Sequence, residues 1–213
     1  MEGMTGKRYN SSMLWKKFRR DIRLAVLAVL MCAACACSKP NTGLPVTGEK
    51  SDMSQYINFA DQDTHIYYDL TIRGMADAMD DKRTFVVYFG YDTCEWCLDA
   101  VPVINDAAKE TGYTVGYINT RANPAWQKNT DMDDYDLLIE KAGEFLDYDA
   151  DGVRHLYAPT LFFIKEGKVV AIHEGTLEGH NARIRAMTAE EREELKGILL
   201  EKFHLLDDDS EKN

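Results

Sequence analysis

The hydrophobic pattern of the chain changes its period several times between residues 65 and 206. The run TFVVYFG at 84–90 is almost unbroken in β-branched and aromatic residues, which is typical of a strand buried on both faces. Shorter apolar runs at 65–71 and 113–120 predict two further strands. Two apolar runs separated by a Lys-Glu-Gly-Lys turn, at 161–175, predict a β-hairpin. The pattern therefore predicts a mixed sheet built around one central strand.

Segments with apolar residues at helical spacing alternate with these strands. We expect helices over 72–81, from about Leu98 to Ala108, and within DYDLLIEKAGEFLDY at 134–148. A capping box formed by Thr188 and Glu191 predicts the start of a last helix. Because helices alternate with strands before the hairpin closes the sheet, the predicted fold class is α/β, with a central mixed sheet covered by helices on both faces.

Charge is unevenly distributed along the 213 residues, whose formal net charge is −11. Residues 1–37 hold seven Lys and Arg residues and two acids, a net charge of +5, so the remaining residues carry −16. A body this acidic excludes nucleic acid as a partner, because nucleic-acid binding requires cationic side chains that neutralise phosphates.

The basic start is followed by the apolar run LAVLAVLMCAACAC at 24–37. This run is shorter than the roughly 20 apolar residues that a membrane-spanning helix needs. A basic segment, a short apolar segment and small residues at its end are typical of an export signal. The sequence therefore predicts an export signal over 1–37 and a location outside the cytoplasm for the rest of the chain.

Three cysteines lie within this predicted signal, and the segment resembles a bacterial lipoprotein signal. The resemblance implies lipidation of Cys37 or Cys35 and a membrane anchor, whereas Ala34-Cys35-Ala36 also fits ordinary cleavage. The polar residues that follow predict a flexible linker over 38–60. The domain is expected over 61–206, and an acidic tail over 207–213.

The motif FGYDTCEWCLDAVP places Cys94 and Cys97 two residues apart, directly after the central strand. A metal site usually needs four ligands, and the motif supplies two, while the five histidines show no paired spacing. A purely structural disulfide across two residues constrains the unfolded chain little, because its loop is very small. The motif therefore favours a redox pair, with no metal.

The position of each cysteine predicts its role. Cys94 lies where the strand ends and the helix begins, so unpaired backbone N–H groups and the helix dipole stabilise its thiolate. Cys97 lies one helical turn later and deeper in the fold. We therefore expect Cys94 to attack a substrate disulfide and Cys97 to resolve the mixed disulfide.

From about residue 65 to 206 the chain resembles the thioredoxin-fold proteins. The motifs that carry this resemblance are the C-x-x-C after a buried strand, Pro102 five residues beyond it, and Ala158-Pro159-Thr160 before LFFI. The resemblance implies a thioredoxin-like fold in which Pro159 is a cis-proline facing the cysteines. It also implies that Ala158, Pro159 and Thr160 contact substrate, and that a partner thiol protein exchanges electrons without any cofactor.

Within this fold, DKRTFVVYFGYDTCEWC resembles the bacteriocin-transport-accessory lipoproteins of Gram-positive bacteria. The chain departs from the thioredoxin pattern in that Tyr88 and Tyr117 replace an acid and a lysine. Trp96, between the cysteines, is either a platform for substrate or a shield. Glu95 is expected to raise the thiol pKa, because its charge disfavours a nearby thiolate.

A helical insert at about 124–152, before the proline, also lengthens the thioredoxin pattern. Its sequence DYDADG begins like a calcium loop, but the twelfth position is Ala158 rather than a glutamate, so we interpret it as an acidic turn.

Two functions follow from the sequence. The first is an extracytoplasmic, membrane-tethered thiol–disulfide oxidoreductase that acts on cysteine-containing proteins or peptides. The alternative is a redox-silent accessory or binding lipoprotein of a peptide export system.

Overall fold

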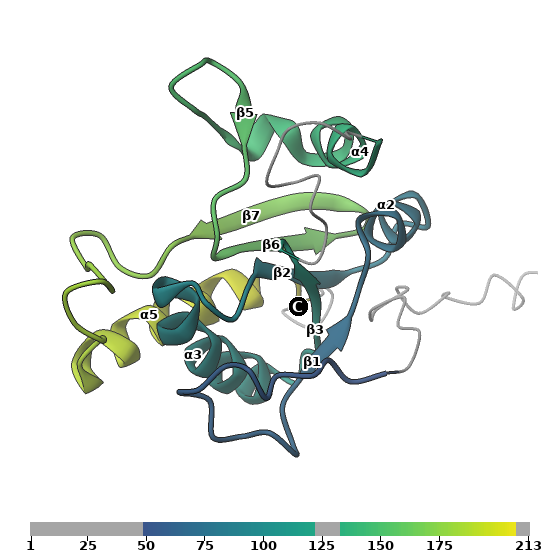
Figure 1. Ribbon diagram of the computed structural model, residues 1–213. Helices are drawn as coiled ribbons and strands as arrows, with labels where there is room; N and C mark the ends of the chain where they lie inside the picture. Colours follow the sequence, from purple (N-terminus) through teal and green to yellow (C-terminus); the bar gives the residue numbers. More distant parts are fainter. Residues whose placement is uncertain (1–48, 122–132, 208–213) are drawn as a thin grey trace, which may run out of the picture. The chain divides into compact units, whose positions relative to one another are not determined.

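The computed structural model describes residues 49–121 and 133–207. A five-stranded sheet with the strand order β1-β3-β2-β6-β7 forms the centre (Figure 1). Its strands are β1 (Tyr67–Asp69), β2 (Phe85–Gly90), β3 (Val115–Asn119), β6 (Thr160–Lys165) and β7 (Lys168–Glu174). Two short strands, β4 (Asp147–Tyr148) and β5 (Arg154–His155), pair separately.

The sheet is mixed, as the sequence predicts. β3 pairs in parallel with both β1 and β2, whereas β6 pairs antiparallel with both β2 and β7. β2 is the central strand, and all six of its residues are buried. A strand flanked by strands and covered on both faces must be apolar throughout, which explains the unbroken run that predicts it.

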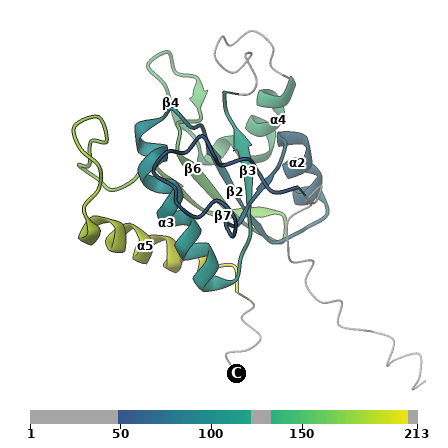
Figure 2. The same cartoon turned by 60° about the horizontal axis from the view of Figure 1, so that its bottom comes forward.

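Helices cover both faces of the sheet. α3 (Glu95–Thr111) and α5 (Ala189–His204) pack with the face that carries Val86 and Tyr88, and α2 (Ile72–Asp80) packs with the opposite face (Figure 2). α4 (Asp133–Ala142) joins α2 on that opposite face. Alternate residues of β2 thus serve two separate cores, because successive side chains of a strand point to opposite faces. The α/β class with helices on both faces is confirmed.

The predicted helix at 134–148 is shorter in the structure. α4 ends at Ala142, a 3-10 turn covers Gly143–Phe145, and Leu146 is extended before β4. Glycine lowers helix stability at this point, which explains the early end. Leu138 and Leu146 both still reach the core, so their apolar spacing reflects burial but not one continuous helix. The helical insert before Pro159 is present as α4, and its residues 124–132 lie outside the described residues.

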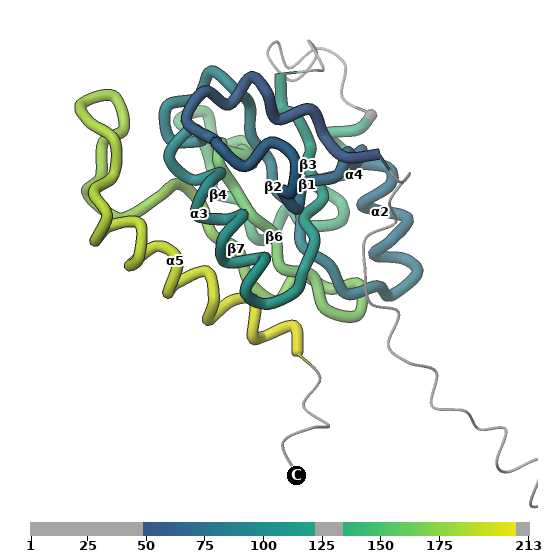
Figure 3. The backbone as a smooth tube through the Cα atoms, turned by 90° about the horizontal axis from the view of Figure 1, so that it is seen from below, coloured from purple at the N-terminus to yellow at the C-terminus, as the bar shows by residue number. Residues whose placement is uncertain are grey.

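Residues 49–60 are not a flexible linker, contrary to the sequence-based prediction. Met53, Tyr56 and Phe59 are buried in the core beneath α3, and Lys50 forms a bridge to Tyr68 in β1. Figure 3 shows this segment, in dark blue, running back across the domain. Polar residues dominate the segment, but its three buried apolar residues recur at every third position and anchor it. The domain therefore includes residues that the predicted boundary at 61 leaves out.

The predicted signal at 1–37, with Cys35 and Cys37, lies outside the described residues, as does the tail beyond Asp207. Among the helices of the described ranges, none combines the length and apolar character needed to cross a membrane.

Candidate active site

Cys94 caps the N-terminus of α3. β2 ends at Gly90, a short turn follows, and Cys94 adopts an extended backbone before the helix begins at Glu95. The Cys94 sulfur accepts a hydrogen bond from the backbone N–H of Cys97, with a sulfur–nitrogen distance of 3.3 Å. The sulfur therefore lies where unpaired helical N–H groups favour a negative charge.

This position makes Cys94 the more acidic of the two thiols. A hydrogen bond from the Cys97 side chain, together with the backbone N–H groups of Cys97 and Trp96, lowers the pKa of Cys94. Burial and the charge of Glu95 oppose that lowering of the pKa, and Glu95 itself is exposed. The donors outweigh the opposing effects, so Cys94 is suited to be the nucleophile.

Cys97 is the inner thiol. It has no exposed surface, and both cysteines are present as free thiols. Burial raises the pKa of Cys97 strongly, and the neighbouring Cys94 raises it further. The pair is thus asymmetric, with a thiolate favoured at the outer position and a neutral thiol at the inner one.

The loop before β6 faces the outer cysteine. The peptide bond between Ala158 and Pro159 is cis, and the Cys94 thiol donates to the Ala158 carbonyl oxygen at 3.6 Å. Ala158 is half-buried, whereas Pro159 and Thr160 are buried. The Thr160 hydroxyl donates to the Tyr157 carbonyl at 2.5 Å, so Thr160 fixes this loop and does not face solvent. Of the three residues predicted to contact substrate, Ala158 is the accessible one.

Trp96 lies between the cysteines in sequence and is half-buried. Its ring packs against the core beneath α3, and the guanidinium of Arg183 lies 5.4 Å from the ring centroid. Trp96 also lines a cavity of about 700 Å³, whose other walls come from residues 173–180 and from α5. The ring is therefore partly shielded by the core and partly open to this cavity.

Three tyrosines, Tyr56, Tyr88 and Tyr117, belong to the core cluster that also holds the two cysteines. Tyr88 and Tyr117 are paired neighbours on β2 and β3, and their rings stack with centroids 5.6 Å apart. The Tyr56 hydroxyl donates to the Tyr117 hydroxyl at 3.1 Å. Burial raises the pKa of Tyr117 to about 12, so this phenol stays protonated at neutral pH. Sequence reasoning missed Tyr56, because it lies in the segment predicted to be a linker.

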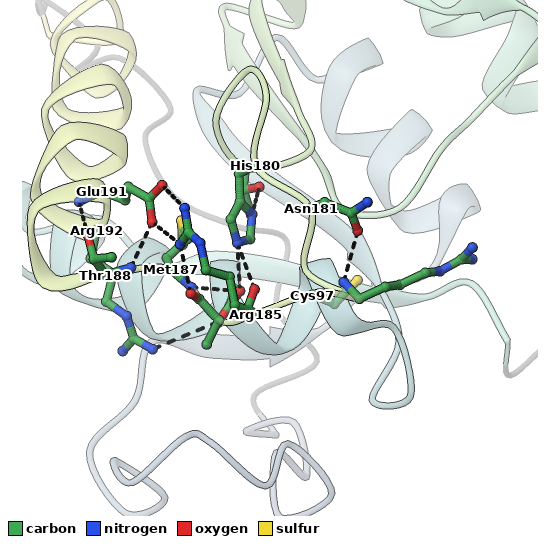
Figure 4. A network of polar contacts seen from close by, with 12 residues as sticks. Cys97, His180, Asn181, Arg185, Met187, Thr188, Glu191 and Arg192 are labelled. Atoms are coloured by element: carbon green, nitrogen blue, oxygen red, sulfur yellow. Dashed lines mark hydrogen bonds and ion pairs between the residues drawn. The ribbon is translucent and has the colours of Figure 1, made fainter.

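A second polar network fixes the loop between β7 and α5. The buried Asp99, two residues after Cys97, accepts from the Met187 N–H at 3.1 Å and lies 3.5 Å from His180 Nε2. His180 in turn contacts Thr176 through Nδ1 at 2.8 Å (Figure 4). This network ties the loop that lines the Trp96 cavity to the active-site helix. Sequence reasoning missed it, because Asp99 and His180 are far apart in the sequence.

Pro102 lies inside α3, as the sequence places it, and has no N–H to donate to the preceding turn. The neighbouring Val101 carbonyl accepts a hydrogen bond from the Tyr67 hydroxyl at 2.6 Å. This bond ties the active-site helix to β1. In the insert, the Asp149 carboxylate accepts from the N–H groups of Asp151 and Val153, as in an acidic turn.

No family model matches this sequence, and no curated protein matches it either. Solved structures do. One is provisionally described as an oxidoreductase with a thioredoxin fold; at 18% identity and a TM-score of 0.37, the match covers 52% of this chain and 83% of that one. Another is thioredoxin O2 from Arabidopsis thaliana in the oxidised state, at 18% identity and a TM-score of 0.32, over 56% of this chain and 88% of that one.

The chain has a thioredoxin-like fold. Parallel β1, β3 and β2, an antiparallel β6–β7 hairpin, a C-x-x-C at the start of α3 and a cis-proline before β6 define it. The nearer resemblance to the bacteriocin-transport-accessory lipoproteins stays a prediction.

Proposed function

We propose that this protein is a thiol–disulfide oxidoreductase whose reactive group is the Cys94–Cys97 pair. The observation that carries the proposal is the asymmetry of the two thiols. Cys94 caps α3 and accepts the N–H of Cys97 at 3.3 Å, while Cys97 has no exposed surface. An attacking thiolate beside a buried resolving thiol is the arrangement that disulfide exchange needs.

The reaction proceeds in two exchanges. The Cys94 thiolate attacks one sulfur of a substrate disulfide, forms a mixed disulfide and releases the other substrate sulfur as a thiolate. Cys97 then loses its proton and attacks the Cys94 sulfur. The Cys94–Cys97 disulfide forms, and the first substrate sulfur leaves as a thiolate. The substrate gains two electrons and takes up the two protons that the cysteines lose. Reversing the steps donates the disulfide instead.

We further propose that the protein works outside the cytoplasm and is tethered to the membrane. The basic and apolar segment at 1–37 supports export, and Cys37 or Cys35 supports a lipid anchor. Its partners are then cysteine-containing proteins or peptides outside the cytoplasm and a second thiol protein that restores the pair. The lipidated position is identified by replacing Cys37 and Cys35 separately by alanine. Mass spectrometry of the membrane-bound protein then shows which variant lacks the lipid.

Trapping of the mixed disulfide tests the enzymatic proposal. Cys97→Ser in the full-length chain removes the resolving thiol and retains Cys94, so covalent partners should accumulate and disappear on reduction. Cys94→Ser is the matched control, because it removes the nucleophile from the same motif and should trap nothing. If Cys97→Ser traps no more than the control, the oxidoreductase proposal fails, and the redox-silent accessory lipoprotein becomes the better model.

A further inference from the structure

Tyr88 carries a hydroxyl group that the fold does not use. Its side chain is completely buried, and among the residues that the structure describes, its hydroxyl has no hydrogen-bond partner of normal geometry. The neighbouring hydroxyls differ: Tyr67 donates to Val101, and Tyr56 donates to Tyr117. A buried polar group without a partner lowers stability, so phenylalanine at position 88 would suit this core better.

The hydroxyl lies at the end of β2 next to the active site. Tyr88 and Gly90 share one face of the strand, and the Tyr88 ring reaches over Gly90, where it occupies the space of the missing side chain. Cys94 and Cys97 begin α3 directly after this end of the strand and belong to the same core cluster as Tyr88. Burial raises the pKa of Cys97, and the nearby Tyr88 side chain acts in the opposite direction and lowers that pKa.

The resolving step creates a charge at this place. Once Cys94 is bound to substrate, Cys97 must become a thiolate inside a pocket closed to water. Burial of an unpaired charge is costly, whereas a hydrogen bond from a hydroxyl to an anion is strong. Burial and the nearby Cys97 charge raise the pKa of Tyr88 well above its ordinary value, so the phenol keeps its proton to donate.

We propose that the Tyr88 hydroxyl is the hydrogen-bond donor to the Cys97 thiolate during the resolving step. This inference deepens the proposed oxidoreductase function and rests on it. In the dithiol form the donor is idle, and in the step that forms the Cys94–Cys97 disulfide it stabilises the attacking sulfur. The proton that leaves Cys97 ends on the departing substrate sulfur, and Tyr88 keeps its own.

The test isolates the resolving step with a chromogenic adduct. The full-length chain in detergent, with Cys32, Cys35 and Cys37 replaced by alanine, is converted into a Cys94 mixed disulfide with 5-thio-2-nitrobenzoate. Attack by Cys97 releases the coloured thiolate, and its rate is followed in a stopped-flow photometer. Tyr88→Phe removes only the hydroxyl. Tyr67→Phe is the control, because it removes another buried hydroxyl from the same cluster.

We expect Tyr88→Phe to slow the release by about threefold at neutral pH. Raising the pKa of Cys97 by about one unit lowers its thiolate fraction about tenfold. The more basic thiolate is also more nucleophilic, which offsets about a factor of three of that loss. Its melting temperature should stay equal or rise, which a merely structural role would not produce. Equal release rates in Tyr88→Phe and the parent chain, or an equally slow release in Tyr67→Phe, would overturn the proposed role of Tyr88. The proposed oxidoreductase function would not be affected by either result. Absence of any release in the parent chain would overturn the proposed oxidoreductase as well.

Discussion

The hydroxyl oxygen of Tyr88 occupies the space in which a side chain at position 90 would begin. A Cβ atom on Gly90 would lie 2.1 Å from that oxygen and 2.4 Å from the ring carbon that bears it. Position 90 therefore needs glycine because of a tyrosine two residues earlier on the same face of β2. The pair links the central strand to the turn that presents Cys94.

Gly90→Ala should destabilise the protein by about 2 kcal/mol, because the added methyl group overpacks a core that cannot yield without moving the Tyr88 ring. Chemical denaturation followed by circular dichroism measures this change. Gly197→Ala is the control: it lies in α5 with no heavy atom within 4 Å of its added Cβ, so it should stabilise the helix slightly. A Gly90→Ala variant as stable as the parent would show that the Tyr88 ring moves freely.

The acidity of Cys94 should depend on the side chain at position 97. The hydrogen bond from the Cys97 side chain is the largest cause that lowers the pKa of Cys94. Cys97→Ser retains a donor, whereas Cys97→Ala removes it, so the pKa of Cys94 should be higher in the alanine variant. Iodoacetamide alkylation across a pH series, with Cys32, Cys35 and Cys37 replaced by alanine, measures both midpoints. Identical midpoints would contradict this explanation.

Tyr56 should be a core residue and not part of a linker. Its side chain is 2% exposed, and its hydroxyl donates to Tyr117. Tyr56→Ala should therefore lower the free energy of unfolding by about 3 kcal/mol, and Tyr56→Phe by about 1 kcal/mol. The neighbouring Ile57 is 81% exposed, so Ile57→Ala is the matched control and should change little. If both alanine variants unfold alike, residues 49–60 do not stabilise the domain.

Asp99 should hold the loop between β7 and α5 in place. Asp99→Ala leaves the buried Met187 N–H without its acceptor and removes the contact with His180, which should cost about 2 kcal/mol. It should also release the loop, so that trypsin cleaves faster after the exposed Arg183. Glu193→Ala, on the exposed side of α5, serves as the control. Unchanged cleavage at Arg183 would show that other contacts hold the loop.

The fold and the cysteine pair could be predicted because their signals are local. An unbroken apolar strand, the C-x-x-C after it and Ala158-Pro159 before the hairpin each occupy a few consecutive residues. The tyrosine cluster and the Asp99–His180 contact could not be predicted, since each joins residues far apart in the sequence. The prediction of a linker over residues 49–60 was wrong, because the polar composition of the segment outweighed the three apolar residues that prove to be buried, at positions 53, 56 and 59.

The central claim is that Cys94 and Cys97 form a reversible disulfide, and a redox titration tests it most directly. The full-length chain in detergent, with Cys32, Cys35 and Cys37 replaced by alanine, is equilibrated in graded glutathione buffers. Free thiols are then alkylated, and the mass of the protein is measured by mass spectrometry. A single two-electron transition within roughly −120 to −270 mV, where known exchange proteins lie, is the predicted result. A disulfide that stays oxidised below about −300 mV, or two thiols that never pair, would contradict the claim.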